Sequence, residues 1–370
     1  MTEIKENILI LEGRRSIGGG QVMTRHICSA LSDSSNLIVF LPDGRSAISE
    51  YLSEYKQYPY PLLEYKRGGK GIVDILKFIL NFICICKSLS RCVSEYKIST
   101  LYVQTSLLIP VAVVVARFHN IKVVSHLHVY HVDRKTRILL NFFLNSGRVA
   151  KIIGVSNYAL SQLNIKNKQK SVVIYNCVNM PEVTSKPTTN ELRKTISIIG
   201  DVIEHKGQYV LLNVIDELPY EIEVNIIGSI VDIEYSNKLT KISQKQKVNI
   251  VGCVDNINHY LSNTDVLIVA SLLKNETFSL AMVEAWVMRV PTIASDFGGM
   301  KELVETLLPQ FADKMLFELG NSLELKQKLE NMLANKDQYQ QISEAVGSVY
   351  NHNFSRNKFL YSIRKAVINN

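Results

Sequence analysis

The sequence predicts an α/β protein built from two doubly wound domains that face a cleft. Short continuous runs of valine and isoleucine alternate with longer segments of helical spacing, and the alternation occurs twice along the chain. Such runs are typical of strands buried on both faces of a parallel sheet. A polar stretch with two prolines at 179–191 separates the two series, and 370 residues suffice for two cores.

The apolar runs place the elements of each half. Helices are expected over 22–31, 72–96 and 108–119, where apolar residues recur at helical intervals. In the first half, strands are expected at 7–13, 36–42, 98–105, 121–128, 150–156 and 170–176. In the second half, they are expected at 195–201, 223–229, 248–252, 265–271 and 290–296. Residues 322–370 are expected to be mostly helical, with a break near 351–355.

The composition is that of an ordinary globular protein, with 46% hydrophobic and 21% charged residues. Six scattered cysteines without a CxxC pair favour free thiols in a reducing compartment over a metal site. The first residues lack the features of a signal peptide, and the apolar runs at 75–86 and 107–116 are too short to span a bilayer. We therefore expect a soluble or peripheral protein.

The formal net charge of +8 points to a solvated basic surface, an anionic ligand, an anionic membrane surface or nucleic acid. Nucleic acid is the least favoured of these partners, because the lysines are spread out and no aromatic and basic signature is present. The basic segment 66–71 and the apolar, basic stretch 72–91 form either a loop and a core helix or an amphipathic face for anionic lipid headgroups.

Two glutamates, Glu276 and Glu284, bracket an apolar run between an expected strand and an expected helix. Eight helical residues span about 12 Å, which is about the reach of an extended sugar-diphosphate-nucleoside. The N–H groups expected to open the helix, and therefore suited to an anion, are those of Phe278, Ser279 and Leu280. The alternative is that both glutamates are solvated surface residues.

A glycine run and a histidine pair are further candidates for a binding site. Gly18, Gly19 and Gly20 follow the first strand and let the backbone approach a ligand closely. The run is not GxGxxG, because Met23 occupies the last position, and this disfavours a dinucleotide oxidoreductase. His126 and His128 should lie on one side of a strand end, as a metal pair without an evident third ligand or as structural histidines.

Residues 265–304 resemble the signature of GT-B glycosyltransferases of the glycosyl transferases group 1 family, similar to glycosyltransferase family 4. The matching positions are Ser271, Glu276, Glu284, Ala285, Val290, Pro291, Gly298, Gly299 and Glu302. In 197–212, Lys206 matches the family's lysine for the donor diphosphate. Asp201 stands where the family often has arginine, and His205 is a candidate for the missing positive charge.

The resemblance implies a GT-B fold of two Rossmann-like domains. Residues 1–172 would bind the acceptor, 173–350 would bind the nucleotide sugar, and 351–370 would form a helix packing back on the N-terminal domain. The implied activity is that of a retaining hexosyltransferase using a UDP- or GDP-linked sugar. The implied acceptor is a lipid-linked glycan in bacterial O-antigen or capsule synthesis. The expected location is the cytoplasm or the cytoplasmic face of the inner membrane. No cofactor or metal is expected.

The resemblance also implies residue roles. Glu276 would contact sugar hydroxyls near the reacting carbon, and Lys206 would stabilise the leaving diphosphate together with the amides of 278–280. Thr277 is a further residue expected to bind the donor. Glu284 would bind the ribose hydroxyls, and His128, or else His126, would contact the donor sugar. Gly18 to Gly20 would close over the diphosphate. The alternatives are an inactive member that binds a glycan or a partner, which Asp201 favours, and a nucleotide-sugar epimerase, which the complete Glu-x7-Glu signature disfavours.

Overall fold

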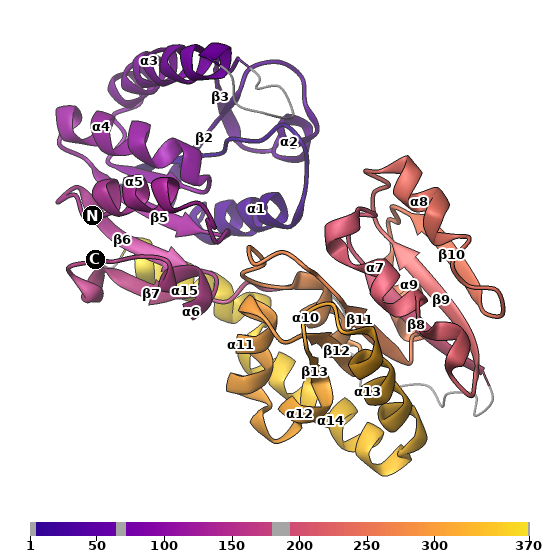
Figure 1. Ribbon diagram of the computed structural model, residues 1–370. Helices are drawn as coiled ribbons and strands as arrows, with labels where there is room; N and C mark the ends of the chain where they lie inside the picture. Colours follow the sequence, from indigo (N-terminus) through magenta and orange to yellow (C-terminus); the bar gives the residue numbers. More distant parts are fainter. Residues whose placement is uncertain (1–4, 64–71, 180–192, 369–370) are drawn as a thin grey trace. The chain divides into compact units, whose positions relative to one another are not determined.

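A computed structural model describes residues 5–63, 72–179 and 193–368 of the chain (Figure 1). The chain forms two compact units, one of residues 1–175 with 357–370 and one of residues 176–356. The units therefore change at 175/176 and 356/357, where the sequence predicted boundaries at 172/173 and 350/351. The expected linker at 179–191 and the basic segment 66–71 lie almost entirely outside the described residues.

The first unit contains a seven-stranded parallel sheet in the order β3-β2-β1-β4-β5-β6-β7. Its strands are β1 (Glu6–Leu11), β2 (Ser35–Pro42), β3 (Lys56–Tyr60), β4 (Thr100–Val103), β5 (Lys122–Leu127), β6 (Val149–Gly154) and β7 (Ser171–Val173). Its longer helices are α1 (Gly19–Leu31), α3 (Ile72–Glu95), α4 (Ile109–His119), α5 (Arg134–Leu144) and α15 (Arg356–Val367), and its short ones are α2 (Ala47–Tyr51), α6 (Asn157–Ser161), η1 (Ser106–Leu108) and η2 (Lys168–Lys170).

The strand order of this sheet reverses between β1 and β4. Because parallel crossovers are right-handed, the reversal places α1 on one face of the sheet and α3, α4 and α5 on the other (Figure 1). The core between them is made of strand residues such as Leu9 and Val103, which are fully buried, and of the inner face of α3.

The second unit contains a six-stranded parallel sheet in the order β10-β9-β8-β11-β12-β13. Its strands are β8 (Arg193–Ile199), β9 (Glu221–Ile227), β10 (Lys247–Gly252), β11 (Val266–Val269), β12 (Thr292–Ser295) and β13 (Leu316–Phe317). Its α-helices are α7 (Gln208–Leu212), α8 (Ile233–Leu239), α9 (Ile257–Ser262), α10 (Leu280–Val287), α11 (Gly298–Leu307), α12 (Ala312–Met315), α13 (Ser322–Ala334) and α14 (Lys336–Asn353). Its 3-10 helices are η3 (Glu204–Lys206), η4 (Ile215–Glu217) and η5 (Pro309–Phe311).

The predicted fold class, two doubly wound parallel α/β units, is confirmed. Every strand expected from a valine and isoleucine run is present, and the C-terminal helices break at 354–355 as the sequence indicates. Strand β3 was not predicted, because its sequence KQYPY has no aliphatic run. Its Pro59 is tolerated because β3 is the edge strand of its sheet.

Along the described chain, no helix combines the length and the hydropathy needed to cross a bilayer.

Candidate functional site

The second sheet reverses its strand order between β8 and β11, and ligands of doubly wound sheets bind beyond the strand ends at such a point. Lys206 follows β8 and Glu276 follows β11, so these two predicted site residues leave neighbouring strands at the same edge. The site lies where the topology alone would place one.

Lys206 is positioned by a tight turn. It ends the 3-10 helix η3, and Gly207 follows with a left-handed φ of 71°. A Cβ atom on Gly207 would come within 2.0 Å of the carbonyl oxygen of Ala270, at the end of β11. The backbone N–H of Leu272 also donates to the carbonyl of His205, at 2.8 Å. The loop after β8 is therefore held directly against the loop after β11.

Lys206 and Glu276 form an ion pair across these loops. Lys206 Nζ lies 3.1 Å from Oε1 and 2.9 Å from Oε2 of Glu276. The Ser271 hydroxyl donates to Oε2 at 2.9 Å. The side chains of the pair are 25% and 20% exposed, so both charges remain within reach of a ligand. The pair holds a cation in place at the strand edge, where a diphosphate could accept from its ammonium group.

The loop between Glu276 and α10 is buried and pinned. Thr277, Phe278 and Ser279 are each less than 10% exposed. Ser279 caps α10 by accepting from the backbone N–H of Met282, at 3.3 Å. The helix therefore begins at Leu280, and not at Phe278 as the sequence indicated. The reason is that Ser279 has an extended backbone and acts as the N-cap, so the residue after it is the first helical one. The N–H groups at this helix start suit an anion.

The glycine pair at the start of α11 completes the support of this loop. The N–H of Gly299 donates to the carbonyl of Glu276 at 3.0 Å. A Cβ atom at Gly299 would lie 2.0 Å from the carbonyl oxygen of Thr277, so only glycine fits there. Gly299 therefore helps to fix the backbone that carries Glu276.

Glu284 lies inside α10 and is half-buried. Among the described residues, its carboxylate has no hydrogen-bond or ion-pair partner, and burial raises its pKa to about 7. A carboxylate that is removed from water and left unpaired is costly, unless a ligand supplies donors. A diol, such as the two hydroxyls of a ribose, could supply them.

Asp201 and His205 stand close to Lys206 in the sequence. Asp201 is exposed, and its backbone carbonyl accepts from the Gln208 side-chain amide at 2.9 Å. His205 is half-buried in η3. The acidic side chain at the position of the family's arginine therefore lies at the surface.

The first sheet reverses at β1 and β4, and the glycine run follows β1. Gly18 is the N-cap of α1, with an extended φ of −149°, and Gly19 and Gly20 begin the helix. The glycines are therefore not required by a left-handed backbone. A Cβ at Gly20 would meet no atom within 4 Å, so the lack of side chains leaves this helix start open to a ligand.

Glu12, which was not predicted from the sequence, organises the same loop. It directly follows β1 and is 1% exposed. The donors to its carboxylate are the N–H groups of Gly13 and Arg14, the Gln21 amide and the hydroxyls of Thr24 and Thr105. A carboxylate with this many donors fixes the loop from both sides. The only sequence signal was an acid directly after a buried strand.

His126 and His128 lie on the same side of the end of β5, as the alternation predicted. Their ring centroids are 4.2 Å apart. The Nδ1 atom of His126 lies 2.9 Å from the Tyr102 hydroxyl, and the Nε2 atom of His128 lies 2.6 Å from Oε1 of Gln104.

Both histidines are neutral at physiological pH. Burial lowers the pKa of His128 to about 4, and burial together with His128 holds the pKa of His126 well below its usual range. They are therefore hydrogen-bonding groups and not cations. Two buried nitrogens, Nε2 of His126 and Nε2 of Gln104, have no partner in the described structure and could serve a ligand.

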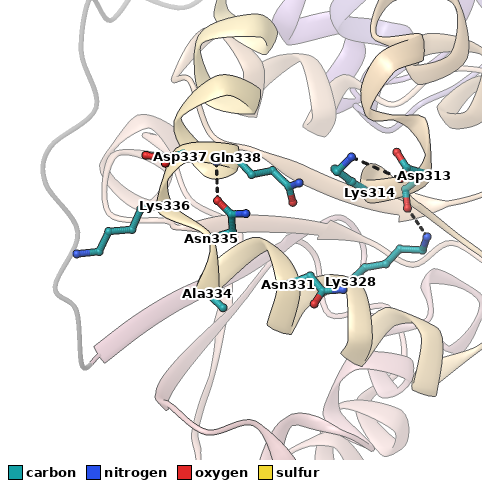
Figure 2. Close-up of a pocket in the computed structure, with 9 residues that line it drawn as sticks. All are labelled: Asp313, Lys314, Lys328, Asn331, Ala334, Asn335, Lys336, Asp337 and Gln338. Carbon is teal, nitrogen blue, oxygen red and sulfur yellow. Dashed lines mark hydrogen bonds and ion pairs between the residues drawn. The ribbon is translucent and has the colours of Figure 1, made fainter.

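A hollow of about 700 Å³ lies elsewhere, between α12, α13 and the start of α14 (Figure 2). None of the predicted site residues lines it. Two of its lining lysines have local partners: Lys314 lies 3.5 Å from the Asp313 carboxylate, and Lys328 donates to the Asp313 carbonyl at 2.5 Å.

Residues 193–335, which carry Lys206, Glu276 and Glu284, match the family model described as glycosyl transferases group 1. This part of the chain is therefore similar to that family. The region that matches the family model therefore contains the strand-edge site of the second unit.

Solved structures share the fold of the whole chain. HepE from Anabaena in complex with UDP is similar with a TM-score of 0.81 and 16% identity, over 98% of this chain and 100% of that chain. A glycosyltransferase from Rickettsia africae is similar with a TM-score of 0.76 and 18% identity, over 99% and 100% of the two chains. The fold is therefore GT-B, with two Rossmann-like units.

Two curated proteins match parts of the chain. An uncharacterized glycosyltransferase from Methanocaldococcus jannaschii is 25% identical over 219 residues, 58% of each chain. An uncharacterized protein in the cps region of Klebsiella pneumoniae is 34% identical over 151 residues, 37% of this chain and 40% of that protein. The matches thus span 58% and 40% of the lengths of these relatives.

Proposed function

We propose that the protein transfers a sugar from a nucleotide-diphosphate sugar to a glycan acceptor. One observation carries this proposal: Lys206 and Glu276 meet at the topological switch point of the unit that matches the glycosyltransferase family. A diphosphate leaving group gains negative charge as its bond to the sugar breaks, and a cation held beside it stabilises that charge.

Each group has a proposed role. Lys206 and the N–H groups at the start of α10 bind the diphosphate. When the donor binds, a carboxylate oxygen of Glu276 accepts hydrogen bonds from sugar hydroxyls in place of one from Lys206. Glu284 accepts from the ribose hydroxyls. On the first unit, the open helix start at Gly18 to Gly20 approaches the diphosphate, and His128, or else His126, contacts the sugar. UDP- and GDP-linked sugars are the proposed donors.

The proposed reaction retains the configuration of the anomeric carbon. The acceptor oxygen forms a bond to the anomeric carbon from the face that the diphosphate leaves. The bond between that carbon and the phosphate oxygen breaks, and the acceptor proton passes to the departing phosphate. Lys206 balances the charge on the phosphate, so the step requires neither a protein nucleophile nor a metal.

The proposed acceptor is a bacterial surface glycan, lipid-linked at the cytoplasmic face of the inner membrane, as in O-antigen or capsule synthesis. Support comes from the partial match to a protein of a Klebsiella cps region. The fold likeness includes a lipopolysaccharide outer core galactosyltransferase, WaaB, with a TM-score of 0.72 and 15% identity over 98% of this chain and 99% of that chain.

The first test is a panel of UDP-, GDP- and other nucleotide sugars, scored by thermal shift and by nucleotide release. We expect one donor to raise the melting temperature and to be hydrolysed slowly. Lys206→Ala should abolish the shift, and Glu276→Ala should reduce hydrolysis by about a hundredfold or more. Lys326→Ala is the matched control, because Lys326 is 23% exposed and pairs with Glu217 at 2.7 Å in the same unit. It should leave both signals unchanged.

Two other outcomes would replace the proposal. A thermal shift without nucleotide release, with or without glycan acceptors, would indicate a binding protein, which the exposed acid Asp201 beside the proposed phosphate site favours. A changed sugar without any acceptor would indicate an epimerase. Equal loss of the shift in Lys206→Ala and Lys326→Ala would show that Lys206 has no special role.

A further inference from the structure

The outer face of α3 is apolar. Leu76, Ile79, Leu80 and Ile83 follow the i, i+3, i+4, i+7 spacing of one helical stripe, and they are 55%, 48%, 51% and 47% exposed. The opposite stripe, which includes Ile85 and Leu89, is buried in the core of the first unit. This part of α3 is therefore apolar on both faces, although only one face packs against the protein.

The same outer stripe ends in two basic residues. Lys87 and Arg91 lie one and two turns beyond Ile83 on the same side of the helix, and both are exposed. Going along α3, the stripe thus presents apolar side chains and then two cations. Such a pattern is typical of helices that lie in a membrane interface.

The neighbouring helices extend this surface. Helices α3, α4 and α5 pack side by side over one face of the sheet (Figure 1). In α5, Ile138, Leu139 and Phe142 are 60%, 45% and 74% exposed, and Arg134 and Lys135 precede them on the exposed side. Two helices of one layer therefore show the same combination of outward apolar side chains and cations.

The charge of this layer is predominantly positive among the described side chains. The cations among the described side chains of α3, α4 and α5 are Lys77, Lys87, Arg91, Arg117, Arg134, Lys135 and Arg137. The acids there are Glu95, at the end of α3, and Asp133, which caps α5. A second copy of this chain docking through the same surface would bring like charges together. An anionic lipid surface would pair with them.

We propose that the outer face of the α3–α5 layer docks on a membrane that contains anionic lipids. The apolar side chains of α3 and α5 enter the boundary between headgroups and acyl chains, and the flanking lysines and arginines contact lipid phosphates. The inference concerns attachment to the bilayer and does not depend on the proposed reaction.

The test is co-sedimentation of the full chain with vesicles. Wild type should bind vesicles that contain phosphatidylglycerol more strongly than vesicles of phosphatidylcholine alone, and salt should weaken the binding. The double variant Ile79→Gln with Ile83→Gln should bind these vesicles at least about tenfold more weakly than wild type, because two apolar side chains no longer enter the bilayer. Lys87→Gln with Arg91→Gln should lose about tenfold and much of the salt dependence.

The matched control replaces exposed apolar residues of the other unit, Ile233→Gln with Leu323→Gln, which are 71% and 65% exposed. It should bind vesicles like wild type. No binding to phosphatidylglycerol vesicles, or an equal loss in the control, overturns the proposal. A dimer in light scattering that dissociates in the Ile79 and Ile83 variant would assign this face to self-association instead. Thermal shift with the donor panel in the same variants reports separately on the proposed function.

Discussion

Glu284 is a half-buried acid whose pKa is raised by its surroundings. Its pKa is about 7 in the folded chain because burial disfavours the charged form, against an ordinary value of 4.5. Between these two values the folded state keeps the proton and the unfolded state releases it. Stability therefore falls as the pH rises through this window, and above it the folded state bears the full cost of an unpaired charge.

Glu284→Gln should remove this cost. The variant should match wild type near about pH 4.5 and exceed it above about pH 7, by up to about 3 kcal/mol. Urea unfolding followed by fluorescence measures this directly, because the chain's single tryptophan, Trp286, is fully buried in the same helix. An equal stability difference at both pH values would show that Glu284 does not titrate as a buried, unpaired group.

The same substitution separates stability from binding. If Glu284 accepts from a ribose, Glu284→Gln should weaken nucleotide binding while it stabilises the fold. A substitution that raises stability and lowers nucleotide affinity indicates a residue that destabilises the free protein and is satisfied by its ligand.

At the residue scale, the sequence predicted which side chains gather at the second unit's strand edge, because Lys206 and Glu276 both follow expected strands. It did not predict that they contact each other, since this contact requires β8 and β11 to be neighbours in the sheet. Glu12 was missed for a related reason. Its donors Thr24 and Thr105 come from two other segments, and only the folded chain brings them together.

At the scale of elements, α11 supports the loop before α10 through a glycine. In Gly299→Ala, the added Cβ would lie 2.0 Å from the Thr277 carbonyl oxygen, so the loop carrying Glu276 must move. We expect a loss of about 1–3 kcal/mol in the unfolding free energy of the second unit, measured by Trp286 fluorescence. We also expect a smaller thermal shift with the donor, because the displaced loop carries Glu276.

Gly147→Ala is the control for this prediction. A Cβ at Gly147 meets no atom within 4 Å, and the residue lies in the turn before β6. It should leave stability within about 0.5 kcal/mol of wild type. If Gly299→Ala behaved in the same way, the close approach of α11 to the loop would have no energetic consequence.

Helix α5 and strand β3 are among the elements that the sequence did not predict. The apolar residues of α5 include Ile138, Leu139 and Phe142, which are exposed, as well as Leu140 and Leu144, which are buried. Strand β3 is short, polar and at the sheet edge. The sequence predicted the buried parallel strands because a strand that is buried on both faces consists of a continuous aliphatic run. An edge strand does not need such a run.

At the scale of the whole molecule, the alternation of strands and helices predicted two α/β units, but it could not supply the strand order. The order matters, because the reversals at β1 and β4 and at β8 and β11 are what bring the two sets of candidate residues to sheet edges. Hydrophobic pattern determines which segments are strands, and the long-range packing that pairs them is not visible in local sequence.

The chain leaves the first unit at 175/176 and returns to it at 356/357, so its last helix belongs with its beginning. In α15, Phe359 is 2% exposed and packs edge-on against His26 of α1, with ring centroids 6.5 Å apart. Arg364 of α15 donates to the carbonyl of Ala30 and pairs with Asp33. The C-terminal helix is thus part of the core of the N-terminal unit.

Phe359→Ala should therefore destabilise the first unit, to which the beginning of the chain belongs. Removing a buried phenylalanine ring costs about 3–5 kcal/mol, and the cost should fall on the first unit. Hydrogen exchange followed by mass spectrometry should show faster exchange in α1 and little change in β8 to β12. The matched core truncation Leu329→Ala, a fully buried residue of α13, should give the reverse pattern. Faster exchange confined to the second unit in Phe359→Ala would place α15 with that unit instead, because exchange rates report the unit whose packing was lost.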